Sequence, residues 1–496
     1  MNYRIWFDGN YVRVRFENPW DYQKLLWVAD RYFAYEVKRW LEEERKFEYF
    51  TVRRYWGNPD KLVFTTYRGL TPRLVKLLKT PYSQVVYREL PYIDLEEVGF
   101  LRKYQQEALI SLLKQLRLCG GAILQGAPGS GKPEIAVALY KVLKPRKCFF
   151  ITLSRDLIIQ AKQRFEKYGF EAGLVDMDHF QVEKPIVCCT GQTLLKAVKK
   201  VERIEEKDIW GTPEEVRLET FEVKDAKKLV NEYRKADLII VDEAHHQPCY
   251  TLRTITMAHP TPLRVGLTAT PWRADGFDME MFATLGDVVP RKITSSELIR
   301  EGYLVPARIV FTHYYPKYGG NYVWSKGGRR LYNVIKKRIY GDPVRNRLIA
   351  ELAKQAPKPV LVLVKEVWHG KLVLKELLKQ GLKAVFAYGQ VSSEERAKIL
   401  ELARKEKIDA IVATQVFDEG VDIPALRTLI LAGGGKSPTK AYQRVGRALR
   451  PFPGKKEALV IDVHDHARYF EQHGWERRKI YRYEKEWKIE DITFKT

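Results

Sequence analysis

Cysteine is scarce in this chain, and its spacing is not that of a metal or redox site. The 496 residues contain five cysteines, an odd number without a CxxC pair: Cys119, Cys148, Cys188, Cys189 and Cys249. We therefore expect neither a disulfide framework nor a zinc site from them, and a reducing cytoplasm is the expected location. Cys188 and Cys189 stand in an apolar run and are interpreted as core residues.

Long hydrophobic runs are also lacking. No apolar run approaches the roughly 20 residues that a membrane-spanning helix needs. Residues 1–10 lack the apolar segment of a signal peptide, and no low-complexity tract or tandem repeat is present. Because 496 residues exceed one ordinary hydrophobic core, we expect two or three folded domains.

Acidic residues are in the minority. The chain has 86 Lys and Arg against 62 Asp and Glu, a formal net charge of +24. Such an excess favours polyanionic partners, nucleic acid first and an anionic membrane second. Without a candidate membrane segment, nucleic acid is the preferred partner.

Residues 1–95 differ in composition from the rest. Tyr and Trp alternate there with Arg and Lys, and two alternating strands are predicted around a turn at residues 8–10, followed by a helix over 21–33. This pattern indicates a small α/β domain. Its aromatic side chains either stack on bases while arginines contact phosphates, or they form an ordinary core.

From about residue 100 the pattern changes to short apolar runs that alternate with helical segments. Such runs are typical of parallel strands buried on both faces of a sheet. We predict one set of strands at 120–126, 147–153, 184–190, 237–245 and 264–270, and a second set at 307–313, 358–365, 383–389, 408–414, 427–433 and 457–463. The predicted fold class is therefore α/β, with two tandem parallel-sheet domains at 96–295 and 296–496. A charged stretch at about 201–230 is predicted to be a surface insertion of the first domain.

A phosphate-binding loop is predicted in the sequence GAPGSGKPEIA, residues 126–136. It follows a predicted strand and precedes a predicted helix, so its backbone N–H groups can converge on phosphates at a helix N-terminus. The loop residues are Gly126, Ala127, Pro128, Gly129, Ser130, Gly131 and Lys132. Lys132 would reach the terminal phosphates. The alternative is a glycine-rich turn without a ligand.

Pro133 departs from the usual loop, which has Ser or Thr at this position. Proline supplies neither the hydroxyl that holds magnesium nor an N–H donor, and it disfavours the α region for Lys132. Three explanations are open: magnesium binding through Asp242, water and the nucleotide alone; a lesion in an otherwise active enzyme; or a protein that has abandoned hydrolysis. We expect an ATPase with impaired turnover.

Two further motifs carry charge at the ends of predicted elements. Asp242 and Glu243 follow a buried strand, where Asp242 is placed to hold magnesium and Glu243 to orient or deprotonate water. Arg447 and Arg450 are three residues apart and share a helix face, so both can stabilise charge on a transferring phosphoryl group. Taken alone, the acidic pair could be an ordinary acidic strand end. Taken alone, the arginine pair could be a solvated or nucleic-acid-binding helix face.

Together these motifs resemble superfamily 2 helicases and translocases over roughly residues 100–465. The ordered motifs are RKYQQEA (102–108), ITLSRDLIIQ (151–160), CTGQTL (189–194), DEAH (242–245), TAT (268–270), VATQVFDEGVDIP (412–424) and QRVGRALR (443–450). GLTATPWRADG, ELIREGYLVPA and the GRALR ending are similar to the branch of XPB-type repair helicases and the phage UvsW helicase. In that branch a small N-terminal domain assists DNA recognition.

The resemblance implies that two RecA-like domains bind ATP and magnesium between them. The implied catalytic residues are Lys132, Asp242, Glu243, Gln443, Arg447 and Arg450, with Asp242 as metal ligand. The implied nucleotide contacts are Arg102, Gln105, the loop residues through Pro133, Gly420 and Asp422. The implied nucleic-acid contacts are Ser154, Arg155, Thr190, Gly191, Gln192, Lys365 and Thr414, with Thr268 and Thr270 linking the two sites. Alternatively, Ser154 and Thr190 cap helices and Lys365 is a solvated charge.

The function we expect is that of an ATP-dependent DNA helicase or double-strand translocase in repair, recombination or fork remodelling. Its partners would be duplex, forked or branched DNA, with single strands and RNA as open alternatives and no membrane. The cytoplasm is the expected location, or the host cytoplasm if the source is viral. The alternatives are the motor of a restriction or defence system and a nucleic-acid-binding protein that does not hydrolyse ATP.

Overall fold

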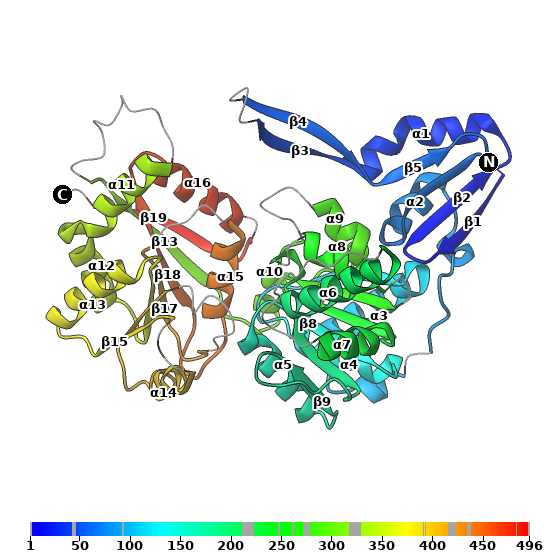
Figure 1. Cartoon of the computed structure of the whole chain (residues 1–496). Coiled ribbons are helices and arrows are strands. Elements are labelled where there is room, and N and C mark those ends of the chain that lie inside the picture. The colour runs from blue at the N-terminus through cyan, green and yellow to red at the C-terminus, as the bar shows by residue number, and fades with distance from the viewer. Residues whose placement is uncertain are drawn as a thin grey trace. The chain divides into compact units, whose positions relative to one another are not determined.

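The computed structural model describes residues 2–41, 46–91, 94–210, 223–246, 249–259, 262–271, 278–316, 329–389, 391, 393–414, 423–433, 438–482 and 484–494. The chain divides into two compact units. The first contains residues 1–126 and 131–293, and the second contains 127–130 and 294–496. Each unit has its own parallel sheet (Figure 1).

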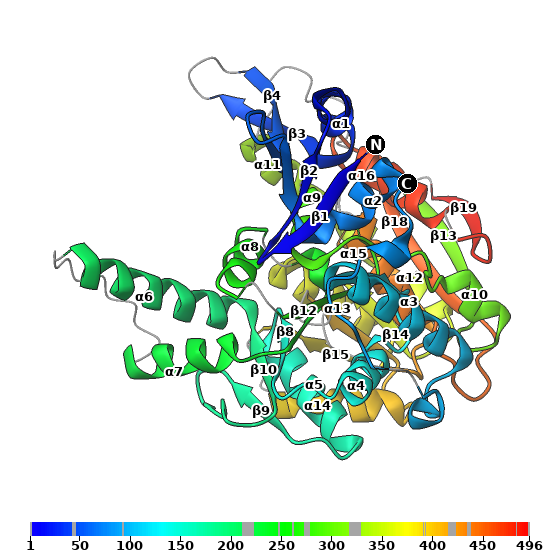
Figure 2. The same cartoon turned by 90° about the vertical axis from the view of Figure 1, so that its right-hand side faces the viewer.

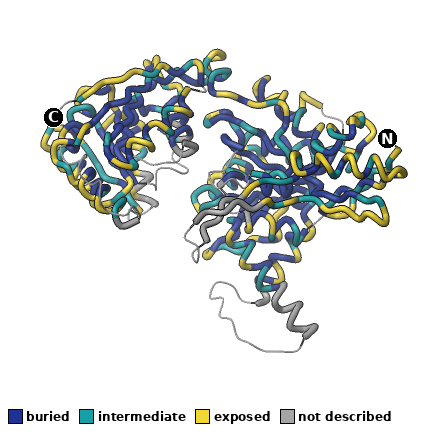
Figure 3. The backbone as a smooth tube through the Cα atoms, turned by 90° about the horizontal axis from the view of Figure 1, so that it is seen from above, coloured by how far each residue is buried: buried dark blue, intermediate teal, exposed yellow. Residues whose placement is uncertain are grey.

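The first unit is built on a six-stranded sheet in which all strands are parallel. Its order is β7 (Gly121–Gln125), β12 (Leu263–Thr268), β11 (Leu238–Asp242), β8 (Cys148–Thr152), β10 (Ile186–Thr190) and β9 (Ala172–Val175). The connecting helices include α3 (Lys103–Cys119), α4 (Lys132–Leu143) and α5 (Arg155–Lys167). The strands are almost wholly buried, as their unbroken apolar sequences predict (Figure 3).

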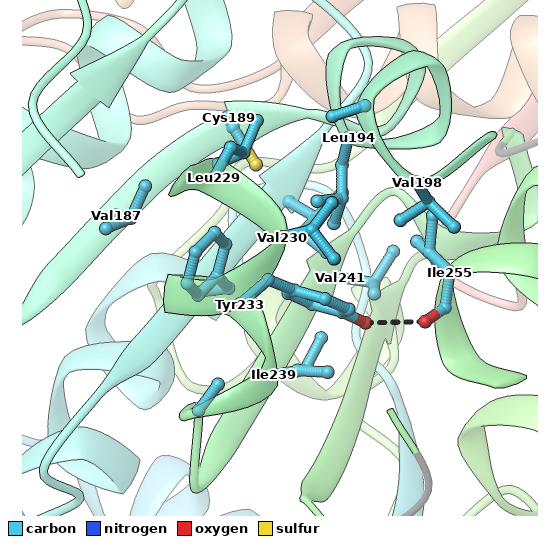
Figure 4. Packing of buried hydrophobic residues seen from close by; sticks show 14 of the residues in the cluster. Val187, Cys189, Leu194, Val198, Leu229, Val230, Tyr233, Ile239, Val241 and Ile255 are labelled. Carbon is cyan, nitrogen blue, oxygen red and sulfur yellow. Dashed lines mark hydrogen bonds between the residues drawn. The ribbon is translucent and has the colours of Figure 1, made fainter. Parts of the chain in front are cut away.

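Two long helices extend into the charged stretch at about 201–230, which we predicted to be an insertion. α6 (Gly191–Trp210) and α7 (Val223–Arg234) run side by side (Figure 2). Their apolar faces, including Val198, Leu229 and Val230, pack on the sheet beside Cys189 (Figure 4). Tyr233 belongs to the same cluster, and its hydroxyl donates to Ile255 O at 2.8 Å. The ends of this stretch therefore contribute to the core, while residues 211–222 lie outside the described residues.

The expected core positions of Cys188 and Cys189 are confirmed, because both are fully buried in β10. Cys119 and Cys148 are also buried and free. Burial raises the pKa of Cys119 and Cys189 to about 12, so both remain unreactive thiols at neutral pH.

The N-terminal residues form a separate antiparallel sheet within the first unit. Its order is β1 (Tyr3–Asp8), β2 (Tyr11–Phe16), β6 (Val63–Tyr67) and β5 (Tyr55–Asn58), covered by α1 (Pro19–Phe33). The predicted turn is confirmed, since Asp8 pairs with Tyr11 across Gly9 and Asn10. A second ribbon, β3 (Ala34–Leu41) with β4 (Lys46–Arg53), extends from this sheet (Figure 1).

The core interpretation is confirmed for some of the N-terminal aromatics, while base stacking by the others stays a prediction. Phe33 and Phe64 are fully buried, whereas Trp20, Trp27 and Trp56 are 66%, 67% and 45% exposed. The sheet packs on α9 (Asp278–Leu285) of the same unit, as shown by the shared core of buried side chains. The boundary at residue 95 stays a prediction.

The second unit has a seven-stranded parallel sheet. Its order is β15 (Ala384–Ala387), β16 (Ala410–Ala413), β14 (Val360–Leu363), β17 (Thr428–Leu431), β18 (Ala458–Asp465), β13 (Ala307–Tyr314) and β19 (Lys488–Phe494). Its helices are α10 (Ser295–Arg300), α11 (Arg329–Gly341), α12 (Pro343–Gln355), α13 (Val367–Lys379), α14 (Ser393–Arg404), α15 (Pro438–Ala448) and α16 (Phe470–Tyr481). The predicted fold class of two parallel α/β sheets with a small N-terminal α/β part is confirmed.

Candidate ATPase site

The phosphate loop has the backbone conformation that its glycines predict. Gly129 and Gly131 adopt φ values of 83° and 77°, in the left-handed region that side chains disfavour. Ser130 N donates to Ala127 O at 3.0 Å, and Gly126 N donates to Thr268 O at 2.8 Å. The loop is thus tied at its start to strand β12 and turns tightly before α4.

Pro133 is accommodated in the first turn of α4 without displacing the lysine. The helix begins at Lys132, and Ile135 N donates to Gly131 O at 3.2 Å. The expected displacement of Lys132 from the α region is wrong, because Lys132 is itself the first residue of α4. The proline also removes no helical hydrogen bond, since an N–H in the first turn has no partner within the helix. Lys132 is 8% exposed, and its Nζ donates to Gly126 O at 3.0 Å.

Gln105 lies beside the phosphate loop. Gln105 is the third residue of α3, and Arg102 immediately precedes the helix. The backbone N–H of Arg102 donates to Gln105 Oε1 at 2.9 Å. The amide Nε2 donates to Gly131 O at 3.5 Å, and a side chain at Gly131 would clash with it. This place next to the loop is consistent with the proposed contact to a nucleotide base.

The acidic pair stands at the carboxyl end of β11. Glu243 has a φ of 47°, an unfavourable conformation for a residue with a side chain, and its N–H donates to Asp242 Oδ1 at 2.9 Å. Burial and the Glu243 carboxylate raise the pKa of Asp242 to about 7, against a lowering effect of Lys132. Two carboxylates beside one lysine carry an excess of negative charge when ionised, and hard oxygen donors suit magnesium. This donor set fits a magnesium nucleotide.

His245 lies beside the acidic pair and is hydrogen-bonded to β12. His245 Nδ1 lies 3.6 Å from Glu243 Oε2 and 2.6 Å from Thr268 Oγ1. Thr268 Oγ1 donates to Thr270 O at 2.9 Å, so the proton of the shorter bond must come from His245 Nδ1. These bonds join the DEAH segment to the TAT segment, and the expected link from Thr268 and Thr270 to the nucleic-acid face stays a prediction.

In the second unit, α15 carries the arginine motif. The backbone of Gln443 and Arg447 is helical, but their side chains lie outside the described residues, as do Gly420 and Asp422 entirely. Arg450 follows the helix and is half-buried. Lys455 stabilises the C-terminal end of α15, because its Nζ donates to Ala448 O at 2.6 Å and Arg450 O at 2.8 Å. Sequence reasoning missed Lys455, which stands among many lysines.

The predicted nucleic-acid residues of the first unit follow two adjacent strands, β8 and β10. Thr190 Oγ1 accepts from Thr193 N at 3.2 Å, so Thr190 does cap α6, as the alternative reading expects. Ser154 precedes α5 without a side-chain capping bond. Arg155 pairs with Asp176 at 2.9 Å and Asp178 at 2.5 Å, which means that a phosphate must compete with two carboxylates.

The remaining candidates occupy similar positions. Gly191 and Gln192 begin α6, directly after β10. In the second unit, Lys365 and Thr414 follow the neighbouring strands β14 and β16, whose last residues pair in register. Lys365 is exposed near the ring of Tyr332, whereas Thr414 is buried and its N–H donates to Ala387 O at 3.2 Å. All seven stand at or just after carboxyl ends of strands, where ligands bind to open parallel sheets.

Two family models match the chain at these elements. Residues 100–273 match the type III restriction enzyme res subunit, and residues 344–451 match the helicase conserved C-terminal domain. The chain belongs to superfamily 2 of the helicases. As a superfamily 2 helicase it is an ATP-dependent enzyme that acts on nucleic acid.

Relatives agree with this superfamily 2 assignment. Helicase 22 of Sulfolobus islandicus filamentous virus (isolate Iceland/Hveragerdi) is 27% identical over 92% of this chain and 78% of its own length. The DNA 3'-5' translocase XPB2 of Sulfurisphaera tokodaii is 27% identical over 76% of this chain and 84% of its own length. An HsdR fragment of a type I restriction enzyme from Vibrio vulnificus YJ016 shares the fold, with a TM-score of 0.54 and 15% identity over 99% of this chain and 91% of the fragment. Among the helices within the described ranges, none has the length and apolarity to cross a membrane.

Proposed function

We propose that this superfamily 2 helicase unwinds DNA or translocates along it in repair, recombination or the remodelling of forks and branches. One observation carries the proposal: the phosphate loop and the acidic pair follow β7 and β11, the two strands that flank β12 in the first sheet. A phosphate-binding lysine and a carboxylate pair form the core of an ATP-hydrolysing site.

Within this site the roles follow from side-chain chemistry. Lys132 would bind the terminal phosphates, and Glu243 would orient or deprotonate the attacking water. Asp242 would hold magnesium, which neutralises charge on the phosphates when bound. Gln105 and Arg102 would contact the base. From the second domain, Gln443, Arg447 and Arg450 would stabilise the transferring phosphoryl group.

For nucleic-acid binding we propose the residues at the strand ends of both units. Hydroxyls, amides and lysines there would contact phosphates and sugars, so affinity should depend on salt and little on sequence. The exposed Trp20, Trp27 and Trp56 of the N-terminal sheet offer stacking surfaces for bases. We propose DNA rather than RNA as the substrate because of the XPB-type resemblance. Because the substrate is a nucleic acid, we propose the cytoplasm as the location, or the host cytoplasm if the source is viral.

A second candidate is the motor of a restriction or defence system. It is supported by the family model that matches residues 100–273 and by the fold shared with an HsdR fragment. Such a motor would need a nuclease supplied by another chain. Co-purification with a nuclease, and cleavage only when the nuclease is present, would favour this candidate.

The proposed function is tested by ATP turnover and strand separation on single-stranded, duplex, forked and four-way DNA. We expect DNA to stimulate turnover, with forked or branched substrates unwound fastest. Lys132→Ala and Glu243→Gln should abolish both activities. Lys144→Ala, which removes an exposed lysine at the far end of α4 paired with Glu97 at 3.3 Å, is the matched control. DNA binding without any turnover in the parent chain and in Pro133→Thr would contradict the proposal and favour a non-hydrolysing protein.

A further inference from the structure

Three histidines converge at one end of the second sheet, in a place that the ATPase function does not use. His313 on β13 pairs in register with His464 on β18, so the two rings project from the same face. His466 lies two residues further on the same side. One ring nitrogen from each lies within 4.8 Å of the others. His464 is fully buried, and His313 is 8% exposed.

The outward ring nitrogen of each histidine faces an oxygen acceptor. His464 Nε2 lies 3.0 Å from Glu471 O, His313 Nε2 lies 2.8 Å from Asp491 Oδ1, and His466 Nδ1 lies 3.3 Å from Glu471 Oε1. Carbonyl and carboxylate oxygens only accept hydrogen bonds, so each of these nitrogens carries the proton.

These hydrogen bonds fix the orientation of each ring and the tautomer of its outward nitrogen. Arg478 pairs with the Asp491 carboxylate and so holds the acceptor of His313 in place. Neutral imidazoles with a fixed tautomer are the form in which histidine binds metals.

The inward nitrogens consequently present three lone pairs to one another. His313 Nδ1 and His466 Nε2 are 2.7 Å apart. His464 Nδ1 is buried and, within the part of the chain that the structure describes, makes no hydrogen bond. Lone pairs that face one another at this distance repel unless a cation lies between them.

We propose that His313, His464 and His466 bind a divalent transition metal, for which zinc is the best match. Three imidazoles with one open position form a known zinc ligand set, and the contacts of the outward nitrogens are those that orient histidine ligands elsewhere. Tetrahedral ligands at 2.0–2.1 Å from zinc stand about 3.3 Å apart. The 2.7 Å pair must therefore separate by about 0.6 Å, and water would fill the fourth position.

The bound ion would join elements that are distant in sequence. It would connect β13 to β18, and through Glu471 and Asp491 it would also restrain the start of α16 and the edge strand β19. Binding should therefore stabilise the second unit, without a requirement for nucleotide or DNA.

The test uses the full-length chain without an affinity tag, first treated with EDTA and then dialysed into buffer with excess magnesium. We expect calorimetry and metal analysis to give one zinc per chain, and zinc to raise the Tm. His466→Ala and His464→Ala should each weaken zinc binding at least tenfold, and Asp491→Asn should weaken it about 10- to 100-fold. His473→Ala is the control, because this histidine lies on α16 close in sequence to Glu471, but its ring contacts Tyr332, with centroids 6.2 Å apart.

Three outcomes would overturn the proposal. The first is a zinc content far below one per chain in the parent protein, with no change in Tm, which would indicate a proton shared between His313 and His466. The second is zinc binding that His466→Ala, the half-buried position, leaves unchanged. The third is equal loss in His473→Ala.

Discussion

Replacing Pro133 by threonine should increase ATP hydrolysis in the presence of DNA. Pro133 is the second residue of α4, next to Lys132, where this superfamily ordinarily places a hydroxyl and a backbone N–H. The loop keeps its shape around the proline, as the position of Lys132 Nζ 3.0 Å from Gly126 O shows. The substitution therefore adds two contacts to a loop that is already formed.

The magnitude follows from those two contacts. A hydrogen bond or metal contact to a charged partner contributes about 1.5–3 kcal/mol. Two of them amount to about 3–6 kcal/mol, which corresponds to roughly 10²- to 10⁴-fold in kcat/KM if both are made in the transition state. Loss of the proline should cost about 1 kcal/mol of stability or less, because its fixed φ suits the first turn.

The assay is steady-state ATP turnover with and without duplex and forked DNA, at several magnesium concentrations. Pro133→Ala restores the N–H alone and should give an intermediate rate, so the expected order is proline, alanine, threonine. Lys132→Ala should remain inactive in every background. Equal, robust rates for the parent chain and Pro133→Thr would refute the reasoning, because they would show that neither contact matters here.

Three further predictions concern charged groups that the structure pairs or buries. Asp178→Asn removes one of the two carboxylates that hold Arg155, so DNA should bind about two- to fivefold more tightly at low salt, as fluorescence anisotropy would show. Asp465→Asn removes the charge that pairs with the fully buried Arg345 at 2.6 Å. It should reduce the free energy of unfolding by about 3–5 kcal/mol in urea titrations, because a buried charge is left uncompensated. Burial lowers the pKa of Lys455 from 10.5 to about 8, so the unfolded chain holds this proton more tightly than the folded chain. The free energy of unfolding should therefore rise between pH 8 and 10.5. The variant Lys455→Met should not show this rise.

Matched controls separate these effects from general changes in charge. Glu183→Gln, which breaks an exposed pair with Lys228, alters the net charge as Asp178→Asn does but should not tighten DNA binding. Glu401→Gln breaks an exposed pair with Lys405 and should leave the free energy of unfolding nearly unchanged. Comparable effects in control and test variants, or a pH dependence that Lys455→Met retains, would contradict the assigned causes.

Most strands of the two parallel sheets could be predicted, because a parallel strand buried on both faces has an unbroken apolar sequence. Two strands escaped that criterion. β9, with the sequence AGLV, is only four residues long. β19, with the sequence KIEDITF, lies at the sheet edge and is mostly exposed, so polar residues interrupt its sequence and no apolar run forms.

The candidate site was predictable where a motif is contiguous, and not where residues meet only through the fold. The loop that ends in Lys132 and the pair that begins with Asp242 are linear patterns. The bond from His245 to Thr268 and the Lys455 contacts join different elements, so no local pattern indicates them. The three-histidine cluster joins His313 to His464 and His466, which are distant in sequence, so no local pattern indicates it.

We propose that both domains contribute to hydrolysis at one ATP site. The most direct test compares kcat and ATP affinity for Arg450→Ala, with Arg308→Ala, a half-buried arginine of β13, as control. We expect Arg450→Ala to lower DNA-stimulated kcat by about 10³-fold or more while ATP binding changes only slightly, since an arginine of this kind acts on the transition state. An unchanged kcat would contradict it.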